Sequence, residues 1–273
     1  MRNNEERLST HHDSSLQPAL SPLEFVVPTS FVELPSKGQF YPEGHPLHNQ
    51  ETIEIKEMTA KEEDILTSKA LIEKGLAVER LLDSIIVDKS IDSDSLLVGD
   101  KNAIIIQARV SAYGPDYKVS VSCPACGEGC KHEFSLSDIE NTEALYHENV
   151  ERLPNNNIII KLNNGWQVEC KMITGKDEKK LVKQSEMKKK KKVPESPLTD
   201  MLNAIIVSVS GHADAETIQK AVGFMPAKDT RLLREAYQAA IPNVDMTQLF
   251  TCPSCDHMED LEVPLSAEFF WPK

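Results

Sequence analysis

Two short cysteine motifs, far apart in the chain, constrain the fold more than any other feature. Each has the form Cys-Pro-x-Cys: residues 123–126 in the middle of the chain and residues 252–255 near its end. A strand-like run precedes each motif and a shorter one follows it. Such a layout is typical of a zinc ribbon, in which two hairpins each present two thiolates to one ion. We therefore predict a tetrahedral, structural Zn²⁺ site whose ligands are Cys123, Cys126, Cys252 and Cys255.

The spacing explains why these cysteines suit a metal. Two intervening residues let one tight turn direct both sulfur atoms at a point about 2.3 Å away. Proline stiffens the turn, and the remaining backbone N–H groups can bond to sulfur. Buried free thiols or disulfides are a second interpretation. A thioredoxin-like redox site fits less well, because no helix begins at the first motif.

A single metal would make the whole stretch between the motifs an insertion within the ribbon. The alternative is two separate sites, with Cys130 and His132 completing the first and His257 contributing to the second. That arrangement leaves the second site short of a fourth ligand. Cys170 stands alone in a strand-like run and is expected to be a core thiol.

Composition limits the remaining possibilities. The 273 residues carry a net charge of −13, which argues against general nucleic-acid binding. No apolar run approaches the roughly 18 residues that span a bilayer, so no membrane partner is expected. The first residues lack the apolar core of a secretory signal. Thiols in metal-like spacing then suit a reducing cytoplasm.

The pattern of elements predicts an α+β fold, with helical regions flanking a zinc-ribbon-like β module formed by the two distant knuckles. The expected segments are a disordered N-terminal tail at 1–22, an ordered loop, a strand and helices at 23–115, the first half of the ribbon plus a β-hairpin at 116–172, a lysine-rich helix or linker at 173–197, a helical region at 198–244, and the second half of the ribbon with an aromatic tail at 245–273.

Capping and turn residues set finer boundaries. A capping box at Thr59 and Glu62 predicts a helix to Lys74 that ends at Gly75. The other expected elements are a strand at 52–56, a helix at 101–113 capped by Asp100, a hairpin at 158–170 that turns at Asn163-Asn164-Gly165, a helix capped by Thr174, a helix at 200–210 capped by Thr199, and helices near 216–221 and 227–240.

The capping and turn patterns assign no role to two aromatic segments and one run of lysines. The loop at 31–46 carries Phe31, Leu34, Phe40 and Tyr41, and we expect it to pack on the core or to dock into a partner. The tail at 269–271 holds three consecutive aromatic residues and should be buried here or in a neighbour. Lys188 to Lys192 read either as a solvated linker or as a contact for nucleic acid or an acidic partner.

Four stretches together resemble the T-even-type phage baseplate family, whose members include hub assembly proteins of contractile-tailed phages. They are Leu34-Pro35-Ser36-Lys37-Gly38 with Tyr41-Pro42, the run from Met58 to Leu66, the two Cys-Pro-x-Cys motifs, and Phe269-Phe270-Trp271-Pro272. The resemblance implies a role in forming the central hub of the tail baseplate, within the infected cell's cytoplasm, with other baseplate or hub proteins as partners. It implies no catalytic activity, and it leaves open whether the protein stays in the virion.

Three functions therefore compete. The first is a structural or assembly protein of the phage tail with zinc as a staple, and the second is a nucleic-acid-binding zinc ribbon that uses the lysine-rich segment. The third, a metalloenzyme, has little support, because the sequence contains no HExxH, no phosphate-binding loop and no GxGxxG. We assign no catalytic and no cofactor-binding residues. The four cysteines are the only predicted site residues, as ligands of the metal.

Overall fold

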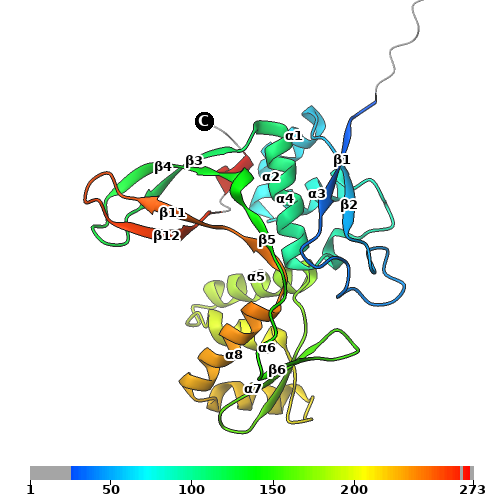
Figure 1. Ribbon diagram of the computed structural model, residues 1–273, viewed down its shortest axis with the longest axis vertical. Coiled ribbons are helices and arrows are strands. Elements are labelled where there is room, and N and C mark those ends of the chain that lie inside the picture. Colours follow the sequence, from blue (N-terminus) through cyan, green and yellow to red (C-terminus); the bar gives the residue numbers. More distant parts are fainter. Residues whose placement is uncertain (1–25, 265–266, 271–273) are drawn as a thin grey trace, which may run out of the picture.

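The computed structural model of the protein describes residues 26–264 and 267–270. The predicted tail at 1–22 lies outside the described residues, as do Trp271 and Pro272 of the aromatic ending. The described chain mixes helices and small antiparallel sheets, and its four motif cysteines lie close together, which confirms the α+β class with a ribbon-like module (Figure 1). None of its helices combines the length and apolarity that crossing a bilayer requires.

The N-terminal part joins a two-stranded sheet to a group of helices. β1 and β2 pair antiparallel, and α4 contacts β1 while α1 contacts α3. The elements are β1 (Thr29–Glu33), β2 (Thr52–Lys56), α1 (Ala60–Thr67), α2 (Lys69–Glu73), α3 (Ala77–Ile85), a 3₁₀ turn η1 (Ser93–Ser95) and α4 (Val98–Tyr113).

The second part, lower in Figure 1, is a four-stranded antiparallel sheet with helices packed against it. The strand order is β6-β7-β8-β9, and α8 contacts β7 while α7 contacts β9. Its elements are β6 (Val150–Arg152), β7 (Ile158–Lys161), β8 (Gln167–Cys170), α5 (Gly175–Lys190), α6 (Pro197–Ile205), β9 (Ile206–Val209), α7 (Ala215–Phe224) and α8 (Ala227–Ala240).

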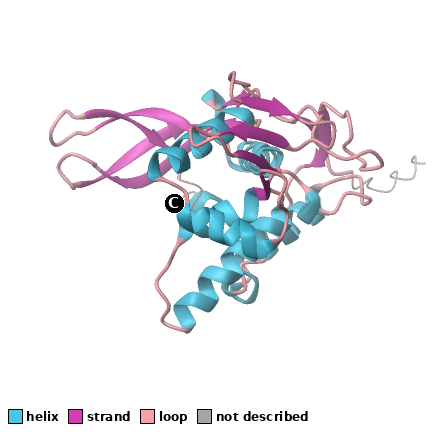
Figure 2. Cartoon of the chain, turned by 90° about the horizontal axis from the view of Figure 1, so that it is seen from below, coloured by secondary structure: helices cyan, strands magenta, loops and turns pink. Residues whose placement is uncertain are grey.

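A projecting arm carries the cysteines. It consists of two antiparallel hairpins, β3–β4 and β11–β12, that extend side by side from the body (Figures 1 and 2). A short pairing of β5 with β10 brings the C-terminal chain back from the lower part to the arm. The bounds are β3 (Asp116–Ser122), β4 (Gly129–Ser135), a 3₁₀ turn η2 (Leu136–Asp138), β5 (Glu140–Thr142), β10 (Asn243–Asp245), β11 (Thr247–Thr251), β12 (Met258–Glu262) and a final turn η3 (Ala267–Phe270).

Several predicted elements are confirmed. The hairpin at 158–170 is β7–β8, and Gly165 takes a φ of +87° in its turn, a conformation that glycine adopts without strain. Thr174 forms a capping box with Asp177 at the start of α5, and α8 has the predicted bounds. The helix that begins at Thr59 ends before Gly75, as expected, but it is not continuous.

Several expected helix boundaries were wrong. The helix expected over 60–74 breaks at Ser68, whose ψ of 105° is extended, so that α1 and α2 are separate. The helix expected over 200–210 begins earlier, at Pro197, and ends at Ile205. Residues 206–209 form β9 instead, because the β-branched run Ile206-Val207 and Val209 pairs with β8 and completes the sheet.

Asp100 does not cap α4, which begins two residues earlier at Val98. Its carboxylate is fully buried and binds the aromatic loop instead. The Ser36 hydroxyl and N–H donate to it at 2.6 and 3.0 Å, and the Tyr41 hydroxyl donates at 2.8 Å. The same Tyr41 oxygen accepts the N–H of Leu97 at 3.1 Å. The loop is therefore fastened to the start of α4.

The rest of the loop supports this docking. Leu34 and Phe40 are buried with Tyr41, so the loop packs on its own core, whereas Phe31 was expected to be buried and is 68% exposed on β1. Gly38 has a φ of +70°, and a Cβ there would lie 2.3 Å from the N atom of Gln50. No larger residue fits that place without moving the backbone.

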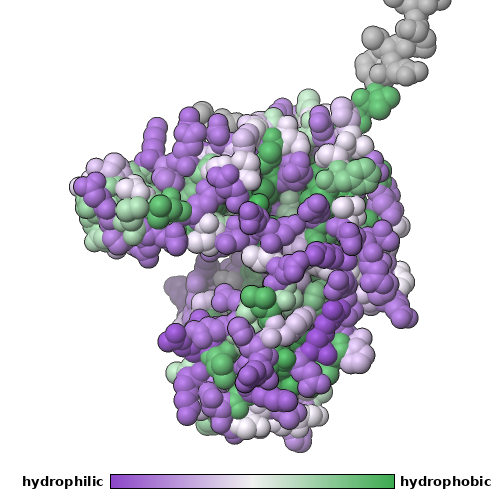
Figure 3. All heavy atoms as spheres, in the orientation of Figure 1, coloured by the Kyte–Doolittle hydropathy of each residue, from purple (hydrophilic) through white to green (hydrophobic). Residues whose placement is uncertain are grey.

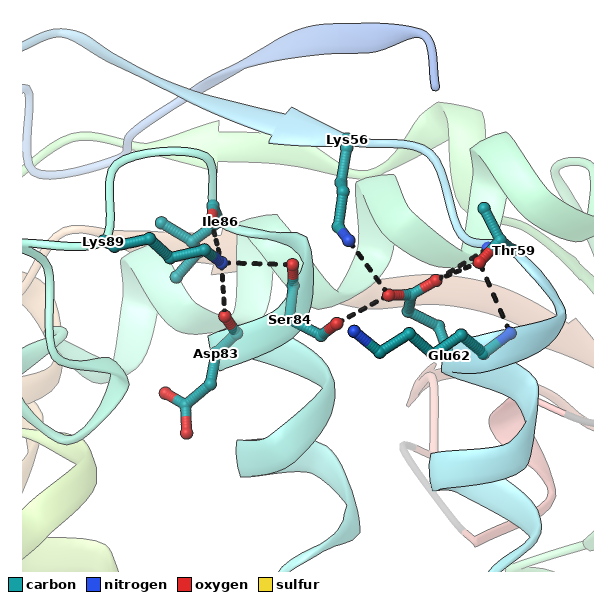
Figure 4. Close-up of polar contacts among 8 residues, drawn as sticks. Lys56, Thr59, Glu62, Asp83, Ser84, Ile86 and Lys89 are labelled. Atoms are coloured by element: carbon teal, nitrogen blue, oxygen red, sulfur yellow. Dashed lines mark hydrogen bonds and ion pairs between the residues drawn. The ribbon is translucent and has the colours of Figure 1, made fainter. Parts of the chain in front are cut away.

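Glu62 is the second buried carboxylate of this part of the chain (Figure 4). It accepts hydrogen bonds from the Thr59 hydroxyl and N–H at 2.5 and 3.0 Å and from the Ser84 hydroxyl at 2.6 Å, and Lys56 lies 3.2 Å away. Burial alone would raise the pKa of Glu62, but these partners lower it from 4.5 to about 2. The charged carboxylate thus ties β2, α1 and α3 together.

We predict that Tyr41→Phe lowers the free energy of unfolding by about 1–3 kcal/mol, because it leaves Asp100 and the Leu97 N–H each short of a partner in a buried place. Urea unfolding measures the change. Tyr113→Phe is the matched control, since the Tyr113 hydroxyl donates only to the exposed Glu63. An equal loss in both variants would contradict the role of the buried contact.

A second prediction concerns pH. The folded pKa of Glu62 lies below its unfolded value, so its contribution is present above pH 4.5 and is lost as the pH falls toward 2. Glu62→Gln should therefore cost about 2–3 kcal/mol at pH 7, and the difference from wild type should shrink over that acidic range. The exposed neighbour Asp64 provides the control Asp64→Asn. A difference that stays constant from pH 7 to 3 would show that the charge is not responsible.

Candidate metal centre

Both knuckles are built in the same way. In the first, the N–H of Cys123 donates to the Glu128 carbonyl at 2.9 Å, and the N–H of Gly127 donates to the Cys123 carbonyl at 2.9 Å. Gly127 has a φ of +74°, which turns the chain back toward β4. The two strands of the hairpin therefore meet at a turn that carries the buried Cys123 and the exposed Cys126.

The second knuckle repeats each of these contacts. The N–H of Cys252 donates to the His257 carbonyl at 2.9 Å, and the N–H of Asp256 donates to the Cys252 carbonyl at 3.0 Å. Asp256 takes the left-handed φ of +54° at the place where the first knuckle has glycine, and aspartate is one of the few other residues that tolerates it. The arm is thus a structural repeat, which the sequence reveals in the two Cys-Pro-x-Cys motifs and the strand-like runs beside them.

The four sulfur atoms converge although the motifs are far apart in sequence. All of them lie within 4.8 Å of one another, and two pairs, Cys123 with Cys255 and Cys126 with Cys252, are 3.8 Å apart. Four sulfurs placed tetrahedrally at about 2.3 Å from an ion are separated by about 3.8 Å. A disulfide requires about 2.05 Å, and all four thiols are free. The sulfur positions therefore fit the shape of a four-thiolate metal site.

The electrostatics of the cluster call for a cation. The N–H groups of Cys126 and Ala125 lower the pKa of the Cys123 thiol to about 7. At Cys255 the N–H of His257 acts in the same direction, but the neighbouring thiols, Cys126 first, raise the pKa to about 12. The contacts among the sulfurs thus favour the protonated form of Cys255 while backbone N–H groups favour the thiolate of Cys123. A bound divalent ion would offset the first of these effects, because it stabilises the deprotonated sulfurs.

Contacts along the arm hold the two hairpins in register below the cysteines. The Gln248 side chain accepts from the Ser135 N–H at 3.0 Å and donates to the Ser135 carbonyl at 2.6 Å. Nearer the tip, the His132 ring packs edge-on against Phe250 and Phe134, with centroids 5.2 and 4.6 Å apart. Phe250 is fully buried together with Cys252. The sulfur cluster therefore lies at the tip of two hairpins that these contacts already hold in register.

The base of the arm is held by a residue that the sequence analysis did not single out. Arg109, buried in α4, donates to the carbonyls of Phe269 at 2.8 Å and Gly114 at 2.8 Å. The Phe269 ring packs edge-on against Tyr117, and Phe270 is also buried. The described part of the aromatic ending thus packs on its own chain. The sequence signal that could have identified Arg109 is its position as a charged residue within the apolar run of α4.

The side chains considered for two separate sites have other roles. His132 packs between aromatic rings, as described above, and the half-buried His257 lies 3.0 Å from Glu259. The Cys130 sulfur faces the carbonyl of Val121 at 3.8 Å and does not belong to the four-sulfur cluster. Cys170 is buried in β8, as a core thiol would be. The geometry therefore favours one shared site.

A serine–histidine pair near the aromatic loop resembles part of a catalytic triad but is arranged differently. The Nε2 atom of His45 lies 2.9 Å from the Ser95 hydroxyl. The Nδ1 atom accepts the Leu47 N–H at 3.1 Å, so in the neutral ring the proton is on Nε2 and points at Ser95. Ser95 in turn donates to the Asp92 carbonyl at 2.6 Å. Burial lowers the pKa of His45, which favours this neutral form, so the ring does not act as a base toward Ser95.

Comparison with known proteins places the whole chain rather than the cysteine site alone. A family model described as T4 bacteriophage base plate protein matches residues 27–271. Curated proteins and solved structures gave no significant match. The matched range begins before β1 and includes both knuckles, the anchored loop and the aromatic ending. Because it covers most of the chain, the protein belongs to the T4 bacteriophage base plate protein family.

Proposed function

We propose that the protein acts in forming the central hub of a contractile phage tail, as a structural or assembly component stabilised by one Zn²⁺. Family membership already implies a structural role in the tail baseplate and contacts with other baseplate proteins. The observation that carries the finer proposal is the convergence of four thiols from two distant motifs. It supports a rigid body whose far end is fastened to its middle, which suits a subunit that presents surfaces to neighbours.

Zinc is the ion that best fits the ligands of this site. All four are thiols, and four protein ligands close the tetrahedron, which is the arrangement of structural rather than catalytic zinc. Soft thiolate ligands also disfavour Mg²⁺ and Ca²⁺. In this proposal Cys123, Cys126, Cys252 and Cys255 are the ligands, and the ion serves as a staple without chemistry of its own. A family of structural baseplate proteins is consistent with a protein that is not an enzyme.

The second candidate, a nucleic-acid-binding zinc ribbon, draws support from one feature. α5 extends through the first lysines of the run, and Lys190 to Lys192 are exposed. Against it, Lys188 is paired with Asp200 at 2.6 Å, and the chain as a whole carries a charge of −13. We therefore place this function second to the assembly role.

The metal site gives a direct test. We expect natively purified protein to contain about one zinc per chain, and Cys252→Ser to lose it together with several kcal/mol of stability, because metal binding and folding are coupled. Cys130→Ser is the matched control, since this thiol lies in the same arm, on β4, but outside the four-sulfur cluster, and it should keep the metal. Clearly substoichiometric zinc in wild-type protein, or equal loss in both variants, would argue against the site.

The hub role is tested in infected cells. We expect an N-terminally tagged chain to co-purify with other tail baseplate proteins, identified by mass spectrometry, because the family is a baseplate family. The Cys252→Ser variant should recover fewer of them than Cys130→Ser. Recovery of nucleic acid or replication proteins in their place would favour the second candidate function.

A further inference from the structure

The outward face of α5 is a basic stripe with one apolar residue within it. Lys176, Lys180, Lys183, Met187 and Lys190 follow each other at intervals of four and three, which places them on one side of a helix. All five are exposed, and Met187 is exposed by 52%. Within the described residues, Lys176, Lys183 and Lys190 form no ion pair, and Lys180 lies 3.7 Å from Asp177 of its own helix. In a chain of net negative charge, this stripe is a separate basic surface.

The outer face of the β11–β12 hairpin has the opposite charge. The register places Leu249 opposite Asp260, with Met258 and Glu262 on the same side of the ladder. Leu249 and Met258 are exposed by 56% and 59%, whereas Phe250 and Leu261 on the other face pack toward β3–β4. Residues 247–262 contain four acidic residues and neither lysine nor arginine. We call this surface the acidic face.

The two surfaces match in spacing as well as in charge. On α5, Lys183 and Lys180 lie about 6 and 10 Å along the axis from Met187. On β12, Asp260 and Glu262 lie about 7 and 13 Å along the strand from Met258. When Met187 is placed against Met258, the two lysines on one side of Met187 therefore face the two carboxylates on one side of Met258. Apolar contact at one end and paired charges along the remainder would bury both methionines.

We propose that these surfaces bind each other between copies of this chain, with the basic stripe of one copy docked on the acidic face of the next. Within one chain a notch separates the arm from the lower part (Figure 3), and no ion pair or hydrogen bond joins α5 to β12 in the described residues. Because the two patches differ, the contact is head-to-tail, and a pair of copies keeps one unused stripe on one copy and one unused acidic face on the other. Assembly can therefore continue into a ring or a filament. This self-association goes beyond the proposed hub role and does not depend on the identity of the metal.

Two charge-reversal variants test the proposal. The stripe variant is Lys180→Glu/Lys183→Glu, and the acidic-face variant is Asp260→Lys/Glu262→Lys. Sedimentation velocity at low salt should show that wild-type mass increases with concentration and decreases when salt is added, because the exposed charges are screened. The self-association of each variant alone should be weakened by at least about tenfold. Mixed at equal amounts, they should associate again, because the native stripe of one variant fits the native acidic face of the other and the two reversed patches are also complementary in charge.

The control is Lys220→Glu/Lys228→Glu, which changes the net charge by the same amount at exposed lysines of α7 and α8, and it should associate as wild type does. Unchanged zinc content and circular dichroism show that the variants are folded. Wild-type protein that remains monomeric at every concentration would overturn the proposal, as would variants that fail to complement each other. Capture of a nucleic acid by the stripe of an otherwise monomeric chain would also overturn it.

Discussion

The return of the C-terminal hairpin to the middle of the chain is the constraint on which the rest of the structure depends. The β11–β12 hairpin has little core of its own and is held to β3–β4 by a few side-chain contacts. The Arg109 contact fastens the base, Gln248 and the His132–Phe250 packing align the middle, and the sulfurs meet at the tip. Each contact joins residues more than a hundred positions apart. In sequence, the entire second part of the fold therefore lies between the two hairpins of the arm.

The N-terminal part depends on two buried carboxylates rather than on an apolar core alone. Asp100 fixes the aromatic loop to α4, and Glu62 fixes β2 to α1 and α3. Two of the stretches that resemble the baseplate family contain these contacts, through Ser36 and Tyr41 in one and Glu62 in the other. In this protein they act as structural anchors. A buried carboxylate with all its partners in place specifies one arrangement of the neighbouring elements, because any other arrangement leaves a costly unpaired charge.

Local patterns predicted what local interactions determine. The Thr59–Glu62 capping box, the Asn-Gly turn at 163–165 and the bounds of α8 all depend on residues close in sequence, and they are present as expected. The convergence of the cysteines followed from their paired spacing. What the sequence could not predict is long-range. Asp100 has the sequence position of a helix cap, but its partners Ser36 and Tyr41 come from a distant loop. Residues 206–209 continue a helical pattern in the sequence, but they pair with the open edge of β8 and form a strand.

The central claim is that one ion, held by four cysteine sulfurs, joins the two hairpins at the tip of this arm. X-ray absorption spectroscopy at the zinc edge of the intact, natively purified protein tests it most directly. The account predicts a single shell of four sulfur atoms at about 2.3 Å, with no nitrogen or oxygen in the first shell. A mixed shell with nitrogen or oxygen ligands would contradict it, because the ion would then not be held by both knuckles together.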